Sequence, residues 1–338
     1  MTSPTASATK TAWQPGTWAV DAALLTVTLV WGINNVAVKT ALQGFSPLSF
    51  NALRFAIAST LAMGLLLITE RRVALPRPDL ALLFGIGFLG NTVYQVGFIK
   101  GMALSTAGNV SFVLATMPAT TALLGFLLRV EVLPWRAWAG LATTLGGALL
   151  IIASGGGGSL SLGGATARGD ILVLAGTLGW CLYTILSRRI LDRYTPLRLT
   201  AWTMVLGTIP LVALSVPELR AQDWSRPAPL HWACLAGSAA LALVFAYVVW
   251  NWGLSRIGTA RTAIYGNITP LWTGFFGWLL LREVWAPARV AGAALILLGV
   301  GMVRSSKAGA ATPAVVCAGP VASAGSGQAA APGLAERP

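Results

Sequence analysis

Aromatic and amide side chains occur together at several places inside long apolar stretches of the sequence. Asn91 and Gln95 are spaced i, i+4, as are Tyr247 and Asn251, so each pair faces one side of a helix. Rings beside amide groups suit a pocket for an amphiphilic organic molecule better than a site for a bare ion. Helix packing and an interfacial aromatic belt are the alternatives. The candidate cavity residues are Trp31, Asn34, Asn35, Arg54, Asn91, Tyr94, Gln95, Trp180, Tyr183, Tyr247, Trp250, Asn251, Tyr265 and Asn267.

Arg54 is the one ionisable residue that falls well inside an apolar run. An arginine at the centre of a membrane helix costs about 2.5–3.5 kcal/mol on insertion scales, so it needs a partner. Two roles are open for it. It could bind a substrate carboxylate, or it could bind backbone carbonyl groups and fix its own helix.

No residues in the sequence have the spacing of an enzyme active site or of a metal centre. The single histidine, His231, stands at the start of a predicted helix, and Cys181, Cys234 and Cys317 are far apart. The glycine run 155–158 lacks the lysine and hydroxyl residue of a phosphate-binding loop. We therefore expect no enzymatic activity, no ATPase, no metal site and no cofactor.

The composition indicates which solvent these residues meet. Of the 338 residues, 56% are hydrophobic and only 10% are charged, whereas an ordinary soluble domain carries about 25% charged residues. The net charge of +13 comes from Lys and Arg residues that punctuate apolar runs. That pattern is typical of membrane topology rather than of a nucleic-acid surface. A soluble enzyme is excluded, and the lipid bilayer is the expected environment.

Ten apolar runs have the length of a membrane-spanning helix, since about 20 residues cross roughly 30 Å of hydrocarbon. The predicted helices are 18–40, 46–69, 80–102, 106–128, 136–154, 170–188, 197–216, 231–253, 260–281 and 287–304. The fold class is therefore an all-α integral membrane protein with ten transmembrane helices. Segments 1–16 and 305–338 are expected to be disordered. The distribution of Lys and Arg places both termini in the cytoplasm, and the expected location is the inner (plasma) membrane.

The chain also resembles itself in two registers. Pro118 recurs as Pro270, 152 positions later, and several glycines keep that offset. Earlier in each half the offset is 149, as between Trp31 and Trp180. Shared apolar composition alone would not keep Trp, Pro and Gly in register. The sequence therefore contains an internal repeat.

Each repeat, residues 17–154 and 169–304, holds five predicted helices. Five is an odd number, so the second repeat enters the membrane inverted relative to the first. Inverted repeats are typical of secondary transporters, which bind substrate between the halves and alternate access by rocking one half against the other. Glu131 and Glu283 follow matching helices and are expected to cap a helix N-terminus. Small residues on matching faces are expected to let helices approach closely.

Several of these residues resemble the motifs of one family, which lie in the first and second helices and at the close of the fourth and ninth. The matching residues are the run Trp31-Gly32-Ile33-Asn34-Asn35-Val36-Ala37-Val38-Lys39, then Pro47, Arg54, Phe55, Pro118, Glu131, Pro270 and Glu283. The chain resembles the EamA-type, ten-helix branch of the drug/metabolite transporter superfamily over residues 18–303. The motifs are specific for the family and weak for the substrate.

The resemblance implies a secondary transporter of a small organic metabolite, with export of amino acids or related compounds as the first hypothesis. Aromatic amino-acid exporters are a plausible near neighbour, but no motif identifies them. Drug export and sugar or nucleotide-sugar transport are alternatives within the same fold. An integral-membrane enzyme and a channel are alternatives of other classes. The expected partners are a small-molecule substrate and the bilayer, with no nucleic acid, and the chain is expected to be a monomer.

Overall fold

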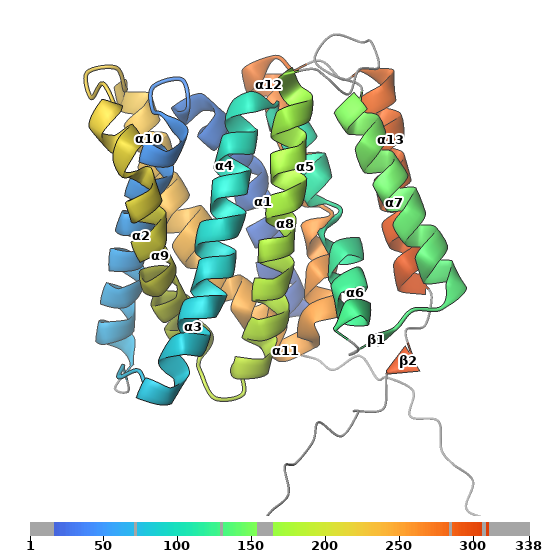
Figure 1. Ribbon diagram of the computed structural model, residues 1–338, viewed down its shortest axis with the longest axis horizontal. Helices are drawn as coiled ribbons and strands as arrows, with labels where there is room; N and C mark the ends of the chain where they lie inside the picture. Colours follow the sequence, from blue (N-terminus) through green and yellow to red (C-terminus); the bar gives the residue numbers. More distant parts are fainter. Residues whose placement is uncertain are drawn as a thin grey trace, which may run out of the picture.

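The fold is almost wholly helical, and its helices run side by side between two ends of the molecule (Figure 1). A computed structural model describes residues 17–70, 73–128, 131–153, 165–283, 286–305 and 309–310. The α-helices are α1 (Thr17–Ala41), α2 (Pro47–Thr69), α3 (Leu80–Gly87), α4 (Tyr94–Leu104), α5 (Ala107–Leu114), α6 (Met117–Leu127), α7 (Trp135–Ala153), α8 (Ala165–Ile190), α9 (Pro196–Ala221), α10 (Pro229–Gly237), α11 (Ala246–Gly266), α12 (Thr269–Leu281) and α13 (Pro287–Ser305). Segment 1–16 and nearly all of 306–338 lie outside the described residues.

Eight helical stretches of the described residues are long and apolar enough to span a membrane. At the position of the predicted ninth helix the chain is interrupted, because α11 ends at Gly266 and α12 begins at Thr269. α11 also passes through Gly258 with φ 78° and ψ 170°, a conformation that glycine adopts readily. At the tenth position, the apolar stretch of α13 is shorter than the others. The all-helical membrane fold is confirmed, and the number of ten spans stays a prediction.

The same interruption occurs in both repeats. The predicted fourth helix consists of two helices. The first, α5, ends at Leu114, and the second, α6, begins at Met117, directly before Pro118. The matching break precedes Pro270. Proline fits the start of a helix because the N–H it lacks would have no partner there. These paired prolines therefore mark where each broken helix resumes.

Two π-helical segments also lie at matching positions. η2 (Phe88–Val93) connects α3 to α4, and η3 (Ser238–Phe245) connects α10 to α11. A π-helix carries more residues per turn than an α-helix and often occurs at functional sites. Each segment therefore changes the direction of the side chains that follow it, which begin with Tyr94 after η2 and with Ala246 and Tyr247 after η3. A short 3₁₀-helix, η1 (Arg77–Asp79), precedes α3.

Glycines bring α7 and α13 into backbone contact. A Cβ atom on Gly140 would lie 2.6 Å from the carbonyl oxygen of Gly299, and one on Gly147 would lie 2.6 Å from that of Gly292. Gly140 and Gly292 are repeat partners, as are Gly147 and Gly299, so the crossing is itself symmetric. Apolar residues of α7 and α13, together with Phe112 of α5 and Ala119 of α6, form a small cluster apart from the main core. The two helices stand together at one side of the molecule (Figure 1).

Two short strands lie at the end of the molecule drawn lowest in Figure 1. β1 (Glu131–Val132) pairs antiparallel with β2 (Gly309–Ala310), with Glu131 opposite Ala310. This pairing attaches the start of the C-terminal segment to the connection between α6 and α7.

Candidate functional site

A cavity lies where the two repeats of the chain meet. Its wall is formed by α1, α2, α4, α5 and α6 of the first repeat and by α8, η3, α11 and α12 of the second. Residues on both sides of both helix breaks line it, namely Leu114, Met117, Gly266 and Thr269. Irregular backbone at membrane depth is tolerated where it borders a cavity. Transporters with inverted repeats bind their substrates at such an interface.

Most of the side chains singled out in the sequence come together at this cavity. Those that line it are Trp31, Asn34, Asn35, Arg54, Tyr94, Gln95, Trp180, Tyr247, Trp250 and Asn267. The other four candidates, Asn91, Tyr183, Asn251 and Tyr265, are not among the lining residues.

Asn91 and Asn251 hold helices together behind the cavity wall. The Asn91 amide donates to the backbone oxygen of Thr203 in α9 at 2.8 Å. The Asn251 amide donates to the hydroxyl oxygens of Tyr183 and Thr200, each at 2.9 Å. Because their amides are used between helices, these residues shape the wall rather than face the cavity.

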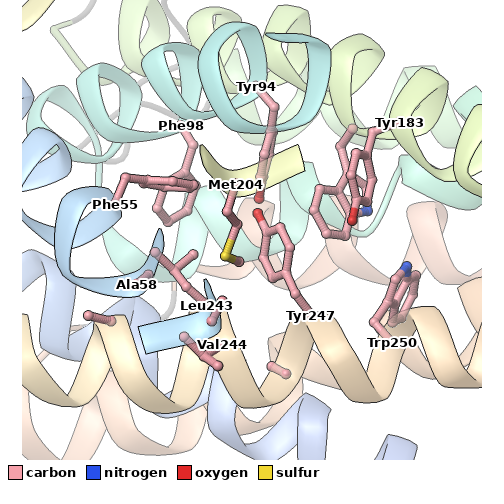
Figure 2. Packing of buried hydrophobic residues seen from close by; sticks show 14 of the residues in the cluster. Phe55, Ala58, Tyr94, Phe98, Tyr183, Met204, Leu243, Val244, Tyr247 and Trp250 are labelled. Atoms are coloured by element: carbon pink, nitrogen blue, oxygen red, sulfur yellow. The ribbon is translucent and has the colours of Figure 1, made fainter. Parts of the chain in front are cut away.

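Aromatic rings from four helices form a continuous cluster around Trp180. Its ring centroid lies 5.8 Å from that of Trp31, 5.2 Å from Tyr94, 5.1 Å from Tyr247 and 6.1 Å from Trp250. Figure 2 shows Tyr94 and Tyr247 extending toward one another from opposite helices, with Trp250 beside them. Edge-to-face and tilted pairs at these distances are favourable beyond the area that they bury. The cluster gives the cavity large, rigid apolar walls.

Arg54 is buried beside this cluster, with 1% of its surface exposed. Its guanidinium donates to Asn51 Oδ1 at 2.6 Å, to Gln95 Oε1 at 2.7 Å and to Ser238 Oγ at 3.1 Å. It also lies within 6 Å of three ring centroids, those of Phe50, Phe55 and Phe98. None of the ion pairs among the described residues includes Arg54. The arginine therefore ties α2 to α4 and η3, and its positive charge faces only neutral acceptors and rings.

Several buried polar atoms in the cavity wall have no hydrogen-bond partner among the described residues. They are Trp250 Nε1, Thr184 Oγ1, Thr269 Oγ1, Asn267 Oδ1 and Arg54 Nε. An unpaired buried polar group costs about 1–3 kcal/mol, so a cavity wall that keeps several of them is suited to a polar solute. The sequence did not single out Thr184 or Thr269, because hydroxyl residues in apolar helices commonly bond to their own backbone.

Charged side chains hold the turn between α4 and α5, at the end drawn uppermost in Figure 1. The Glu283 carboxylate accepts from the backbone N–H groups of Ala107 at 2.8 Å and Gly108 at 3.0 Å. The Lys39 ammonium donates to the backbone oxygens of Met102 and Ser105. Glu283 thus caps α5 in the other repeat rather than the helix that follows it. The side chain of its counterpart Glu131 lies outside the described residues.

Two repeat-related aspartates hold helices at opposite ends of the molecule. Asp170 in α8 is fully buried and accepts from Ser105 Oγ at 2.5 Å and from Asn109 Nδ2 at 3.0 Å. Asp21 in α1, 149 positions earlier, accepts from the Tyr265 hydroxyl at 2.5 Å. Each aspartate lies in the second turn of the first helix of one repeat and binds the broken helix of the other. Among the described residues, no group of three or more His, Cys, Asp or Glu side chains could hold a metal ion.

Comparisons with known proteins agree with this architecture. The chain is 26% identical to the uncharacterized transporter YoaV of Bacillus subtilis, over 82% of this chain and 94% of that one. It is 27% identical to an S-adenosylmethionine/S-adenosylhomocysteine transporter of Chlamydia trachomatis, over 81% of this chain and 85% of that one. It is 26% identical to a probable terminal-alkyne amino-acid exporter of Streptantibioticus cattleyicolor, over 84% of this chain and 93% of that one.

A solved crystal structure shares the fold, with a TM-score of 0.62 and 18% identity, over 84% of this chain and 96% of that one. The sequence pattern of the EamA-like transporter family matches the chain twice, over residues 18–153 and 167–305. These two matches correspond to the two repeats whose interface forms the cavity. The chain therefore belongs to the EamA-like transporter family.

Proposed function

We propose that the protein is a secondary transporter that exports an amino acid or a closely related metabolite across the cytoplasmic membrane by alternating access. The observation that carries this proposal is the cavity between the repeats, which combines aromatic walls with unpaired polar atoms. An amino acid needs both kinds of surface, since it joins an apolar or aromatic side chain to two charged groups. The terminal-alkyne amino-acid exporter, among the similar proteins, supports the same substrate class.

The two ends of the cavity support alternating access. At the end where α5 begins, Glu283, Lys39 and Asp170 bind the α4–α5 turn from three other elements. If both termini are cytoplasmic, as the Lys and Arg distribution predicts, this end faces outward, and we propose that these contacts hold it closed. The units 17–154 and 169–304 would then move against each other. As the contacts at the α4–α5 turn break, other contacts would form at the opposite end of the cavity.

A metabolite screen tests the substrate class. Purified protein in detergent is heated with amino acids, nucleosides, polyamines or sugars, because a ligand stabilises the state that it binds. Amino acids are expected to raise the melting temperature more than the other three groups. Stabilisation by sugars or nucleosides alone would replace the amino-acid proposal with one of the alternatives within the same fold.

A further inference from the structure

We propose that the cavity binds its substrate through an anionic carboxylate, held by the Asn34 amide, the Tyr247 hydroxyl and the Trp250 indole. In this proposal, which rests on the proposed transport function, Arg54 does not touch the substrate. It is a positioning residue, because it determines which way the hydrogen bonds of its neighbours run.

The first branch of the network runs from Arg54 to Tyr247. An arginine side chain can only donate hydrogen bonds, so the amide of Gln95 must turn its oxygen toward Arg54, at 2.7 Å. The amide nitrogen of Gln95 then faces the Tyr247 hydroxyl and donates to it at 3.0 Å. Because Tyr247 accepts this bond, its own O–H proton is left to donate elsewhere. No described residue accepts that proton, and Tyr247 lines the cavity.

The second branch runs from Arg54 to Asn34 by the same logic. Arg54 donates to Ser238 Oγ at 3.1 Å, so the hydroxyl proton of Ser238 points onward to Asn34 Oδ1, at 2.5 Å. The Asn34 amide therefore presents its N–H₂ group on the other side. No described residue accepts from that group, and Asn34 also lines the cavity.

A third donor completes the arrangement. The indole N–H of Trp250 is buried in the cavity wall without a partner, and the Trp250 ring lies 5.1 Å from that of Trp31 in α1. Asn34, Tyr247 and Trp250 thus offer hydrogens from α1 and α11. The two branches that lead from Arg54 to the cavity, through Gln95 and through Ser238, each end in a donor. The third bond of Arg54, to Asn51 Oδ1, continues to the backbone oxygen of Gln95 and does not reach the cavity. This part of the wall therefore favours an anion.

The charge of Arg54 acts in the same direction. No described carboxylate pairs with it, and charges interact more strongly in a poorly polarisable interior than in water. A single fixed positive charge and neutral donors match a carboxylate with one negative charge. The unpaired oxygen of Asn267 and the faces of the aromatic rings remain for an ammonium group. An amino-acid zwitterion satisfies both sets of groups.

Binding of matched compounds to the purified full-length protein tests this proposal. The probes are L-phenylalanine, 3-phenylpropionate, L-phenylalaninamide and phenethylamine, with the corresponding four compounds of the leucine series. Calorimetry and thermal stabilisation are the readouts. Hydrogen bonds to a charged group contribute strongly, so in each series the two carboxylates are expected to bind about tenfold or more tightly than the two compounds that lack a carboxylate.

Gln95→Glu is the sharpest variant, because it has nearly the same shape but cannot donate to Tyr247. A glutamate there would pair with Arg54 and accept the Tyr247 proton. The hydrogen bond between residue 95 and Tyr247 would then be reversed, and Tyr247 would have no proton left for the substrate. Carboxylate affinity is expected to fall about tenfold or more, while the melting temperature without ligand stays at or above the wild-type value.

A second variant, Tyr247→Phe, removes only the hydroxyl and is expected to weaken the binding of the carboxylate compounds selectively. Gln43→Glu, at an exposed position, is the matched control.

Three results would overturn the proposal. They are equal binding of the amide and the acid, unchanged carboxylate affinity in Gln95→Glu, and the absence of stabilisation by any carboxylate of the panel. Failure of the proposed function gives a different pattern. If 3-phenylpropionate binds and Tyr247→Phe weakens it, but no amino acid binds or is transported, the carboxylate site stands and the amino-acid export proposal fails.

Discussion

The carboxylate of Glu283 accepts a hydrogen bond from the backbone N–H of Ala107 at 2.8 Å, although the residues are 176 positions apart. This contact joins the end of α12 in the second repeat to the start of α5 in the first. The N–H groups in the first turn of a helix have no partner within it, and an acid is stabilised there. Under the proposed alternating-access function, we expect this contact to hold the α5 end of the cavity closed and to break when the repeats move.

Replacement of Glu283 by Gln is expected to loosen this end. A glutamine oxygen can still accept one N–H, but its amide nitrogen cannot accept the second. In a chain without native cysteines, a cysteine introduced at the fully buried Ala107 reports the opening. Its labelling by a polar maleimide is expected to become about tenfold faster in Glu283→Gln, from the loss of a charge-assisted bond.

The matched control is Glu70→Gln at the opposite end, where the wild-type carboxylate accepts the Thr195 hydroxyl and no other group among the described residues. Labelling of the Ala107→Cys probe should not change in this variant. An unchanged rate in Glu283→Gln would show that Glu283 does not hold the α5 end closed.

The α7–α13 crossing predicts a contrast between neighbouring glycines. A Cβ on Gly140 meets the Gly299 oxygen at 2.6 Å, whereas one on Gly146 meets nothing within 4 Å. Gly140→Ala is expected to destabilise the protein by about 1–3 kcal/mol, as overpacking usually does, and Gly146→Ala is expected to be neutral or slightly stabilising. Melting temperatures of the two variants in detergent provide the test, and equal values would contradict the backbone contact.

The aromatic cluster predicts a specific loss of transport. Trp31→Ala removes a ring that contacts both Trp180 and Trp250, and Tyr94→Ala and Trp250→Ala remove further parts of the wall. We expect each to lower substrate affinity a few-fold to tenfold, because an aromatic contact contributes about 0.5–1.5 kcal/mol beyond area. Trp278→Ala, at a 60% exposed ring, controls for general damage. Normal transport by all three cavity variants would show that these residues have a structural role and do not bind the substrate.

The positions of the acids predict how transport depends on a pH difference. Asp21 and Asp170 bind helices near the ends of the spans, and no carboxylate of the described residues lines the cavity. We expect transport down the substrate gradient or by exchange, with little dependence on an imposed pH difference. Proteoliposomes with and without that difference provide the measurement. Strong uphill accumulation that is lost in Asp21→Asn would make Asp21 the coupling site and contradict the prediction.

The repeat made much of the fold predictable from sequence. The 152-residue offset between Pro118 and Pro270 correctly predicted that the fourth and ninth helices correspond to each other. It did not predict that each of these helices is interrupted. Hydrophobic periodicity could not reveal η2 and η3, because a π-helical turn adds residues without changing the apolar character of the run. For the same reason the orientation of Asn91 was not predictable, and its amide bonds to Thr203 instead of lining the cavity.

The polar network was harder to predict than the fold. Arg54 drew attention because a charge inside a span is costly, but its partners Asn51 and Ser238 are small polar residues that give no signal in an apolar run. The capping role of Glu283 was predicted, whereas its target was not, because local sequence does not show which distant helix begins nearby. These contacts depend on how the two repeats meet, which a one-dimensional pattern does not contain.

Counterflow of a labelled amino acid in proteoliposomes tests the central claim most directly. The vesicles hold purified protein and a high internal concentration of unlabelled L-phenylalanine or L-leucine, and the labelled compound is added outside. An alternating-access carrier should show saturable uptake that the internal amino acid stimulates and that Trp31→Ala reduces. Uptake that is absent, or that neither saturates nor responds to the internal amino acid, would contradict transport of amino acids by alternating access.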